Sequence, residues 1–565
     1  MAPIAFLPQD PHTLYAAAQY VLKSKDGGFN WQEVSPDLTQ KPEAAKAKPD
    51  PRRAVITTLA LSPVKAGVIW AGTGNGLIQV TKDGKAWQNV TMAGLPERSG
   101  VTLLEASRHD AAAAYAVING FHELRPLIYR TRDYGQTWQL ITTGLPASGN
   151  ARVIREDPVR KGLLYAGTWD GIYVSLDDGD RWQTLQLNLP TATVTDLDVH
   201  GDDLVSSTYG RSLWILDDVT PLRQFDAKWT QSDAYLLRPR NVVRVRWDMS
   251  QDTPLPPETP AGENPPDGAI MNYFLKSEPT GDIKLTIYDA RNSLVREFSN
   301  VPAPFDKAPA NAPEYWFAPT PALSKKAGLN RFTWDLRYPA MKTLRYSYYG
   351  NALDYIEYTL SDHAIPGEFP RELQPGPFVV PGEYSLVLTV AGKIYRQPLI
   401  VTPDPRVHAS QSDLVRQLDA ELNISAQMSV TTEGYDQVRA LRAAIADRQK
   451  SLGADAAAKD AADALKALDD QASDIGNGKS DDLGIGPLNR ELARLAFMVE
   501  SGDARPAALL QSGVDQYCQD LTKRLAQWRE LNQQKIAPAN ALLQKYNLTP
   551  LSVSANVPVA PGCGK

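Results

Sequence analysis

The chain has little cysteine and little histidine. Its 565 residues include two cysteines, Cys518 and Cys563, and six histidines. So small a set excludes a small disulfide-rich scaffold and leaves few ligands for a Cys/His zinc cluster. We expect no metal site and no cofactor. The two cysteines either form one disulfide, which would tie the C-terminal segment to a helix, or stay free thiols.

The chain also lacks an excess of one charge and a long apolar run. Its 59 basic and 65 acidic residues are interspersed and give a net charge of −6. Without a basic stripe, nucleic acid is not expected as a partner. No stretch approaches the roughly 18 apolar residues of a membrane span, and the first residues show no signal peptide. A glycine-rich phosphate loop and a Ser-His-Asp order are missing as well.

What the sequence does contain is a repeated pattern, Ser/Thr-x-Asp-x-Gly-x-x-Trp. Three copies end at Trp31, Trp138 and Trp182, and a copy one residue shorter ends at Trp87. Counted from Asp to Asp, the copies are 57, 50 and 44 residues apart. That period is the length of a four-stranded antiparallel unit with its loops, so the pattern predicts the blades of a β-propeller.

Each copy contains residues suited to a tight turn between two strands. An Asp carboxylate can accept backbone N–H groups, Gly allows a positive φ, and Trp fills the space between neighbouring sheets. We therefore assign a structural role to the four repeat carboxylates, Asp26, Asp83, Asp133 and Asp177. A partial unit from Val194 to Leu216 brings the expected number of blades to about five, in a ring that is not necessarily closed.

The repeats resemble the Asp-box (BNR) repeat of sialidases, xyloglucan-specific glycosidases and sortilin receptors. More widely, the chain is similar to bacterial sortilin-like or "glycosyl hydrolase" BNR-repeat proteins. The shared strings include Ser35 to Thr39, Gly210 to Asp218, Gly262 to Gly268, Trp334 to Arg337 and Asp404 to Arg406. The resemblance implies an exported protein with a propeller, a β-sandwich and a helical tail. Against that pattern the chain begins in mid-propeller, so we expect that earlier blades are missing and that a partner chain could supply them.

Changes in periodicity divide the chain into five ranges. Residues 1–218 are expected to form the blades, 219–268 a linker with a Pro-rich loop, and 269–408 an immunoglobulin-like β-sandwich. Period-two runs predict strands over 269–275, 283–288 and 384–390. A period of 3.6 predicts a helical bundle over 409–548, in which Asp503 caps a helix that has Pro506 in its first turn, followed by a tail, 549–565. A tyrosine-rich insertion, 346–358, could stack on sugars or simply pack against the propeller.

Chemistry is expected in the turns that link the second and third strands of each blade, because loops that differ between repeats carry function. Two carboxylates in these turns, Glu123 and Asp170, are the catalytic candidates, since a glycosidase needs two such groups. Aromatic faces suit sugar rings, and a guanidinium suits an acidic group. The ligand-binding candidates are Gln19, Tyr20, Asn75, Asn119, His122, Trp169, Tyr209 and Arg211.

Three functions remain open from the sequence. The first is an exported, sortilin-like propeller protein that binds a peptide or a glycan in the periplasm or outside the cell. The second is a glycoside hydrolase that acts on a polysaccharide through Glu123 and Asp170. The third is a structural subunit whose propeller is completed by another chain.

Overall fold

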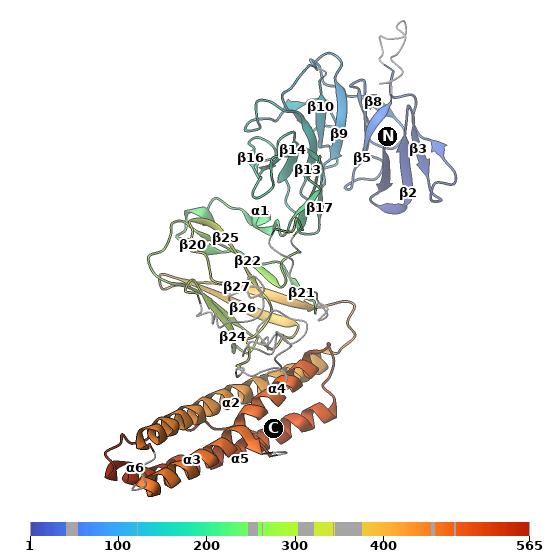
Figure 1. Cartoon of the computed structure of the whole chain (residues 1–565). Coiled ribbons are helices and arrows are strands. Elements are labelled where there is room, and N and C mark those ends of the chain that lie inside the picture. Colours follow the sequence, from blue (N-terminus) through green and yellow to red (C-terminus); the bar gives the residue numbers. More distant parts are fainter. Residues whose placement is uncertain are drawn as a thin grey trace. The chain divides into compact units, whose positions relative to one another are not determined.

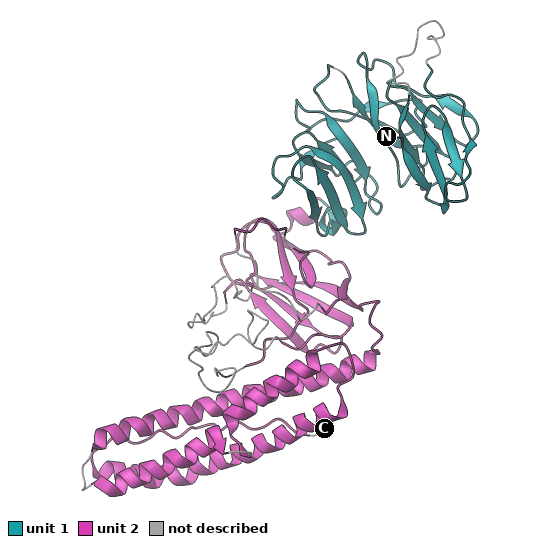
Figure 2. Cartoon of the chain, turned by 45° about the vertical axis from the view of Figure 1, so that its right-hand side comes forward, with its two compact units in different colours: residues 1–226 teal, residues 227–565 magenta. Residues whose placement is uncertain are grey.

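The computed structural model describes residues 2–40, 55–120, 122–246, 258–262, 264–302, 321–342, 344, 376–453, 458–479 and 482–563. The chain divides into two compact units, Met1–Asp226 and Ala227–Lys565 (Figures 1 and 2). Small antiparallel sheets make up the first unit. The second combines two further sheets with a helical C-terminal region that includes a two-stranded hairpin.

The described residues of the first unit form five sheets in chain order, and each is a meander of neighbouring strands. The first four sheets have four strands each, as the repeat predicts: β1 (Ile4–Leu7), β2 (Asp10–Ala17), β3 (Val21–Ser24) and β4 (Gln32–Glu33); β5 (Ile56–Leu61), β6 (Ile69–Thr73), β7 (Ile78–Thr81) and β8 (Trp87–Asn89); β9 (Gly100–Ala106), β10 (Ala114–Asn119), β11 (Leu127–Thr131) and β12 (Gln139–Leu140); β13 (Ala151–Glu156), β14 (Leu164–Thr168), β15 (Ile172–Ser175) and β16 (Gln183–Thr184). The fifth sheet has three strands: β17 (Val194–His200), β18 (Asp203–Thr208) and β19 (Leu213–Leu216).

Neighbouring sheets pack face to face, so each interface has its own apolar core. Val21 and Ile69 lie in the core between the first and second sheets, and Ile78 and Ala116 in the next. The third and fourth sheets share another core, and the fourth and fifth share the last. Burial between sheets explains why the inner strands are apolar on both faces, as in β6 and β14, where every residue is buried.

The repeated Asp residues occupy equivalent turns between the third and fourth strands. Each carboxylate accepts the hydroxyl of the Ser or Thr two residues earlier at 2.8–3.1 Å. Each also accepts a backbone N–H on its C-terminal side at 2.9–3.0 Å. The backbone N–H of Asn30 is the main reason that the pKa of Asp26 falls to about 2. Gly28, Gly135 and Gly179 have φ of 94°, 82° and 91°, which only glycine adopts without strain.

The repeated Trp residues link each sheet to the one before it. The indole Nε1 of Trp87 donates to the Val34 carbonyl, Trp138 to Val90 and Trp182 to Ile141, at 2.8–3.1 Å. Each acceptor directly follows the fourth strand of the preceding sheet. It is the last residue of a second shared pattern, Trp-Gln-x-aliphatic, which the repeat analysis missed: Trp31 to Val34, Trp87 to Val90, Trp138 to Ile141 and Trp182 to Leu185.

The second unit begins with two sheets that share one core. One sheet has the order β20 (Ala234–Leu236), β22 (Ala269–Leu275), β25 (Gly328–Trp334). The other has the order β21 (Val242–Arg244), β27 (Lys393–Pro403), β26 (Gly382–Val390), β23 (Ile283–Tyr288), β24 (Leu294–Ser299). The predicted strands 269–275 and 283–288 are confirmed, and 384–390 lies within β26. Their core includes Met271, Ile287 and Leu386.

The range predicted as a linker, 219–268, contains more structure than its sequence suggested. It holds the short helix α1 (Thr220–Gln224), a 3₁₀ turn (Trp229–Gln231) and the strands β20 and β21. Each of these strands is three residues long, too short to show alternation. Pairing with β22 and with β27, respectively, makes them strands.

Helices form the rest of the second unit, as the period of 3.6 predicted. They are α2 (Gln411–Leu452), α3 (Lys459–Asn477), α4 (Ile485–Glu500), α5 (Ala508–Glu530) and α6 (Ile536–Lys545). A two-strand hairpin, β28 (Gly478–Lys479) and β29 (Asp482–Leu483), links α3 to α4, and a π-helical segment, Leu531–Lys535, precedes α6. A disulfide joins Cys518 in α5 to Cys563. Within the described helices, none is long and apolar enough to cross a membrane.

The predicted cap of α5 is wrong. Asp503 does not cap α5, because the N-cap position is Ala507 and the Asp503 carboxylate instead pairs with Arg244 and Arg246. Ion pairing with arginines distant in sequence outweighed the local capping signal. The tyrosine-rich segment 346–358 and residues 254–257 of the Pro-rich loop lie outside the described residues.

Candidate ligand-binding rim

The predicted site turns all lie between the second and third strands of their sheets. They follow β2, β6, β10, β14 and β18, and we call them together the turn rim. In a meander these turns share one end of the sheet with the connection to the next sheet, while the repeated Asp turns lie at the other end. The structure therefore separates the structural carboxylates from the candidate site.

Two exposed aromatic side chains stand on neighbouring parts of this rim. Trp169, between β14 and β15, is 56% exposed, and Tyr209, between β18 and β19, is 81% exposed. Thr193 connects them, because its hydroxyl donates to the Trp169 carbonyl at 3.0 Å and its carbonyl accepts the Tyr209 N–H at 2.8 Å. The guanidinium of Arg152 lies 5.9 Å from the centre of the Trp169 ring. Both aromatic turns are thus held by their backbones while their rings face solvent.

The third sheet continues this line through Asn119. Its side-chain carbonyl accepts from the Asn150 amide at 3.1 Å, and the Asn150 backbone carbonyl accepts the Trp169 N–H at 3.1 Å. Hydrogen bonds therefore run without a break from Asn119 to Tyr209. We call Asn119, Asn150, Trp169, Thr193 and Tyr209 the aromatic line.

The remaining predicted binding residues are less well placed. The side chain of Asn75 is used within the fold, since it donates to the Thr39 carbonyl and accepts from the Thr73 hydroxyl. Tyr20 is 37% exposed and lies with Gln19 on the first sheet. His122 and Arg211 are exposed in the turns that follow β10 and β18. Of the predicted binding residues, the hydrogen bonds therefore link Asn119, Trp169 and Tyr209, on the third to fifth sheets.

The two candidate catalytic carboxylates already have partners. Both oxygens of Glu123 accept from the Arg125 guanidinium at 2.9 Å, and this bidentate bond is the main cause that lowers the pKa of Glu123 to about 2. Asp170 accepts the Thr168 hydroxyl at 2.6 Å and the Tyr173 hydroxyl at 3.4 Å. Glycoside hydrolysis needs a carboxylic acid that is still protonated at working pH. Glu123 cannot fill that role.

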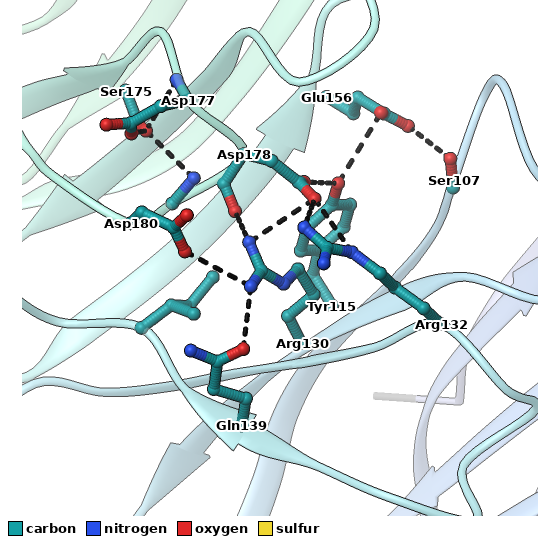
Figure 3. A network of polar contacts seen from close by, with 12 residues as sticks. Ser107, Tyr115, Arg130, Arg132, Gln139, Glu156, Ser175, Asp177, Asp178 and Asp180 are labelled. Carbon is teal, nitrogen blue, oxygen red and sulfur yellow. Dashed lines mark hydrogen bonds and ion pairs between the residues drawn. The ribbon is translucent and has the colours of Figure 1, made fainter.

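A second set of ionisable groups, which the sequence analysis missed, lies between the third and fourth sheets (Figure 3). The Tyr115 hydroxyl donates to Asp178 at 2.5 Å, and the Arg130 guanidinium bonds Gln139 at 2.7 Å and Asp180 at 3.1 Å. Tyr115 is only 2% exposed, and burial followed by the neighbouring carboxylates raises its pKa. A buried phenol with a raised pKa is not a nucleophile. The set instead fixes the turn in which Asp178 has a φ of 61°.

The second unit contains another buried set, centred on the ring of Phe378. The guanidinium carbons of Arg244, Arg246 and Arg337 lie 4.3, 5.2 and 4.8 Å from the ring centre. Arg244 and Arg246 are strand and post-strand residues of the range that had been predicted as a linker. Such a stack of three cations on one ring needs nearby anions.

The helical region supplies those anions, with Glu500 at the end of α4 and Asp503 in the segment between α4 and α5. Asp503 pairs with Arg244 at 2.6 Å and with Arg246 at 2.8 Å, while Glu500 pairs with Arg246 and Arg337. We call the three arginines with Glu421, Glu500 and Asp503 the charge cluster. Burial, and then Glu500, raise the pKa of Glu421 to about 7, against smaller lowering effects of Arg246 and Arg337. The cluster joins the sheets to the helical region through buried ion pairs, so we assign it to stability.

No group of three or more His, Cys, Asp or Glu side chains in the described ranges is arranged to hold a metal ion. No protein-family model and no curated protein matches the sequence.

Several solved structures show a low likeness to the chain. The GH74 xyloglucanase from Xanthomonas campestris has 16% identity over 48% of this chain and 42% of the enzyme, with a TM-score of 0.32. The Niastella koreensis GH74 enzyme has 12% identity over 38% of this chain and 29% of the enzyme, with a TM-score of 0.29. YCF48 from Cyanidioschyzon merolae has 15% identity over 40% of this chain and 69% of that protein, with a TM-score of 0.28. The chain spans less than half the length of either GH74 enzyme, and these likenesses assign it to no family.

Proposed function

We propose that the chain is an exported binding protein, built on a sortilin-like propeller of Asp-box repeats, that takes a glycan or a peptide at its turn rim. The equivalent Asp turns and the repeated Trp hydrogen bonds support the propeller. The disulfide between Cys518 and Cys563 supports export, because disulfides persist in the periplasm or outside the cell.

The observation that carries this proposal is the aromatic line. Trp169 and Tyr209 present large exposed rings on adjacent sheets, and a common residue, Thr193, fixes their backbones. Rigid aromatic faces bind sugar rings or apolar peptide side chains at a low cost in conformational entropy. The amide of Asn150 and the guanidinium of Arg152 add polar groups beside them.

Binding fits the geometry better than hydrolysis does. With its pKa near 2, Glu123 is ionised throughout the neutral range and cannot donate a proton to a leaving group. An ionised Glu123 could act only as nucleophile or base, and its two oxygens already accept from Arg125. The proton donor would then have to be Asp170, whose carboxylate accepts hydrogen bonds from Thr168 and Tyr173.

The test is a screen of the whole chain against a glycan array and a peptide library, followed by affinity measurements on the hits. Trp169→Ala and Tyr209→Ala are each expected to weaken binding about tenfold or more, a loss of about 1.4 kcal/mol. Phe29→Ala is the matched control, because Phe29 is an aromatic residue 88% exposed in an Asp turn at the opposite end of its sheet. Equal losses in all three variants would contradict a site on the aromatic line.

A separate assay addresses hydrolysis directly. Release of reducing ends from a broad polysaccharide panel is expected to stay at background for the unmodified chain. Turnover that disappears in both Glu123→Gln and Asp170→Asn would overturn the binding proposal in favour of the enzyme.

A further inference from the structure

The fifth sheet departs from the pattern of the first four, because its described strands include no fourth strand. After β19 the chain turns at Asp218 and enters α1. Arg223 holds this exit in place through ion pairs with Asp157 at 2.9 Å and Asp202 at 2.5 Å. β19 is therefore an edge strand, and its Leu213 and Ile215 are 69% and 55% exposed.

The Leu185 carbonyl of the fourth sheet corresponds to the carbonyls that accept a Trp N–H in the earlier sheets. No described Trp of the fifth sheet fills this place. The Leu185 N–H bonds the Ile172 carbonyl at 2.8 Å, as Val34, Val90 and Ile141 bond the corresponding residues of their own sheets. The carbonyls of those three residues each accept an indole N–H from the next sheet, whereas no described Trp donates to Leu185. A groove lies at this point, lined by Leu185, Leu189, Leu204, Trp214 and Leu216 among others.

The groove also contains a buried polar atom without a partner. Ser206, which lines it, is 1% exposed, and its hydroxyl oxygen makes no hydrogen bond. Ser206 pairs with Trp214 across the sheet. The cross-strand equivalents in the first four sheets are all alanines: Ala16, Ala71, Ala116 and Ala166. A buried hydroxyl that has no partner costs free energy, so its presence only in the incomplete sheet points to a ligand.

We propose that this groove and the β19 edge bind an extended segment of a partner protein that carries Trp-x-x-aliphatic. The segment adds to β19 as an antiparallel fourth strand, and its indole enters the groove beside Leu185 and Ser206. The surface continues an interface that this chain already forms three times, with Trp87, Trp138 and Trp182 as the inserted residues. Its occupant therefore shares their pattern.

A second copy of the chain does not provide such a strand from the described residues. Each Trp-Gln-x-aliphatic segment, including the one at Trp31, already pairs with the third strand of its own sheet. Because these four segments of the described chain are already paired, we assign the occupant to a different polypeptide.

The test uses the whole chain and a capped, fluorescently labelled peptide with the sequence of residues 179–187. This peptide contains Trp182 and Leu185 and thus the pattern of a fourth strand. Saturable binding is expected, with at least a tenfold loss when the peptide carries Trp182→Ala. Every second residue of β19 points its backbone N–H to the open edge, and Ile215 is one of them. Amide exchange at Ile215 should therefore slow on binding. Lack of saturation, or equal affinity of the Ala peptide, would overturn the proposal.

Variants of the chain separate this site from the turn rim. Ser206→Leu fills the groove and should lower peptide affinity at least tenfold, with near-UV circular dichroism as the check on folding. If Ser206→Leu does not fold, Ile215→Lys on the exposed edge provides the second variant. Phe29→Ala, in an exposed Asp turn of the first sheet, should leave binding of this peptide unchanged. A loss in Trp169→Ala but not in Ser206→Leu would place the peptide on the turn rim and overturn this proposal, so the two proposals can fail independently. Self-association of the chain that is blocked by the peptide would instead identify a second copy as the occupant and overturn the choice of partner.

Discussion

The repeat carboxylates of the first unit and the cluster carboxylates of the second unit are used in opposite ways. In the first unit Asp26 and Asp133 bond groups two to four residues away in their own turns. In the second unit Glu500 and Asp503 pair with arginines 163 and 257 residues away in the sequence. The turns are at the surface, whereas the charge cluster is buried. A local carboxylate therefore shapes a single turn, and a distant one holds separate elements together.

The two kinds of carboxylate also differ in how much stability is lost when one is removed. A carboxylate in an exposed turn keeps much of its hydration, so its loss affects stability modestly. A buried pair has surrendered that hydration, and removal of one member leaves the other charge uncompensated. Variants of Glu500 and Glu421 test this difference, and variants of the disulfide and of a Trp hydrogen bond provide a scale for it. They follow from the largest expected effect to the smallest.

The largest effect is expected from Glu500→Ala. Arg246 and Arg337 would lose a shared buried partner, at a cost of roughly 3–5 kcal/mol in the free energy of unfolding. Urea denaturation followed by helical circular dichroism measures it, since all the long helices lie in the second unit. Asp470→Ala, which removes an exposed pair with Lys466, should cost less than about 0.5 kcal/mol. A similar cost for both variants would remove the distinction between the two kinds of carboxylate.

The disulfide should have the next largest effect. It spans 45 residues, and closing a loop of that length contributes about 3–4 kcal/mol in the chain-entropy account. Replacement of Cys518 and Cys563 by Ser should lower the thermal midpoint, and a reducing agent should lower that of the parent chain but not of the variant. A midpoint insensitive to the reductant would show that the link does not stabilise the helices.

Glu421 provides a pH test of the cluster. Because its pKa is raised from 4.5 to about 7, the folded state binds the proton more tightly than the unfolded chain does. Its contribution to stability is full below about pH 4.5 and is lost as the pH rises through 7. Glu421→Gln should thus match the parent at pH 4.5 and exceed it by roughly 3 kcal/mol at pH 8, measured by urea denaturation. An advantage that does not grow with pH would contradict the raised pKa.

The smallest effect concerns the Trp hydrogen bonds of the first unit. Trp138→Phe removes the bond to the Val90 carbonyl and should cost about 1 kcal/mol. Trp31→Phe is the matched control, because Trp31 is 40% exposed in the first sheet and has no preceding described sheet to bond. Thermal melting of the two variants should therefore differ. Equal changes would mean that the bond between sheets adds nothing measurable.

The turn rim shows how far a sequence prediction of a site can go. The turns that contain Asn119, Trp169 and Tyr209 could be located, because the repeat places the same connection in every unit. Their link through Thr193 and Asn150 was missed, since these residues precede other strands and carry no local signal. The pairing of Glu123 with Arg125 was also missed, although the two residues are only two apart, because spacing alone does not distinguish a free carboxylate from a paired one.

The sequence by itself determined the elements whose cause is local. The Asp turns, the strands at 269–275 and 283–288 and the helices after residue 409 follow from turn chemistry and periodicity, which act within a few residues. Only the tertiary structure decided the strands β20 and β21, the role of Asp503 and the charge cluster around Phe378. Those features depend on burial and on partners far away in the chain, where a low dielectric makes charge pairing decisive and where no pattern in the sequence records which groups meet.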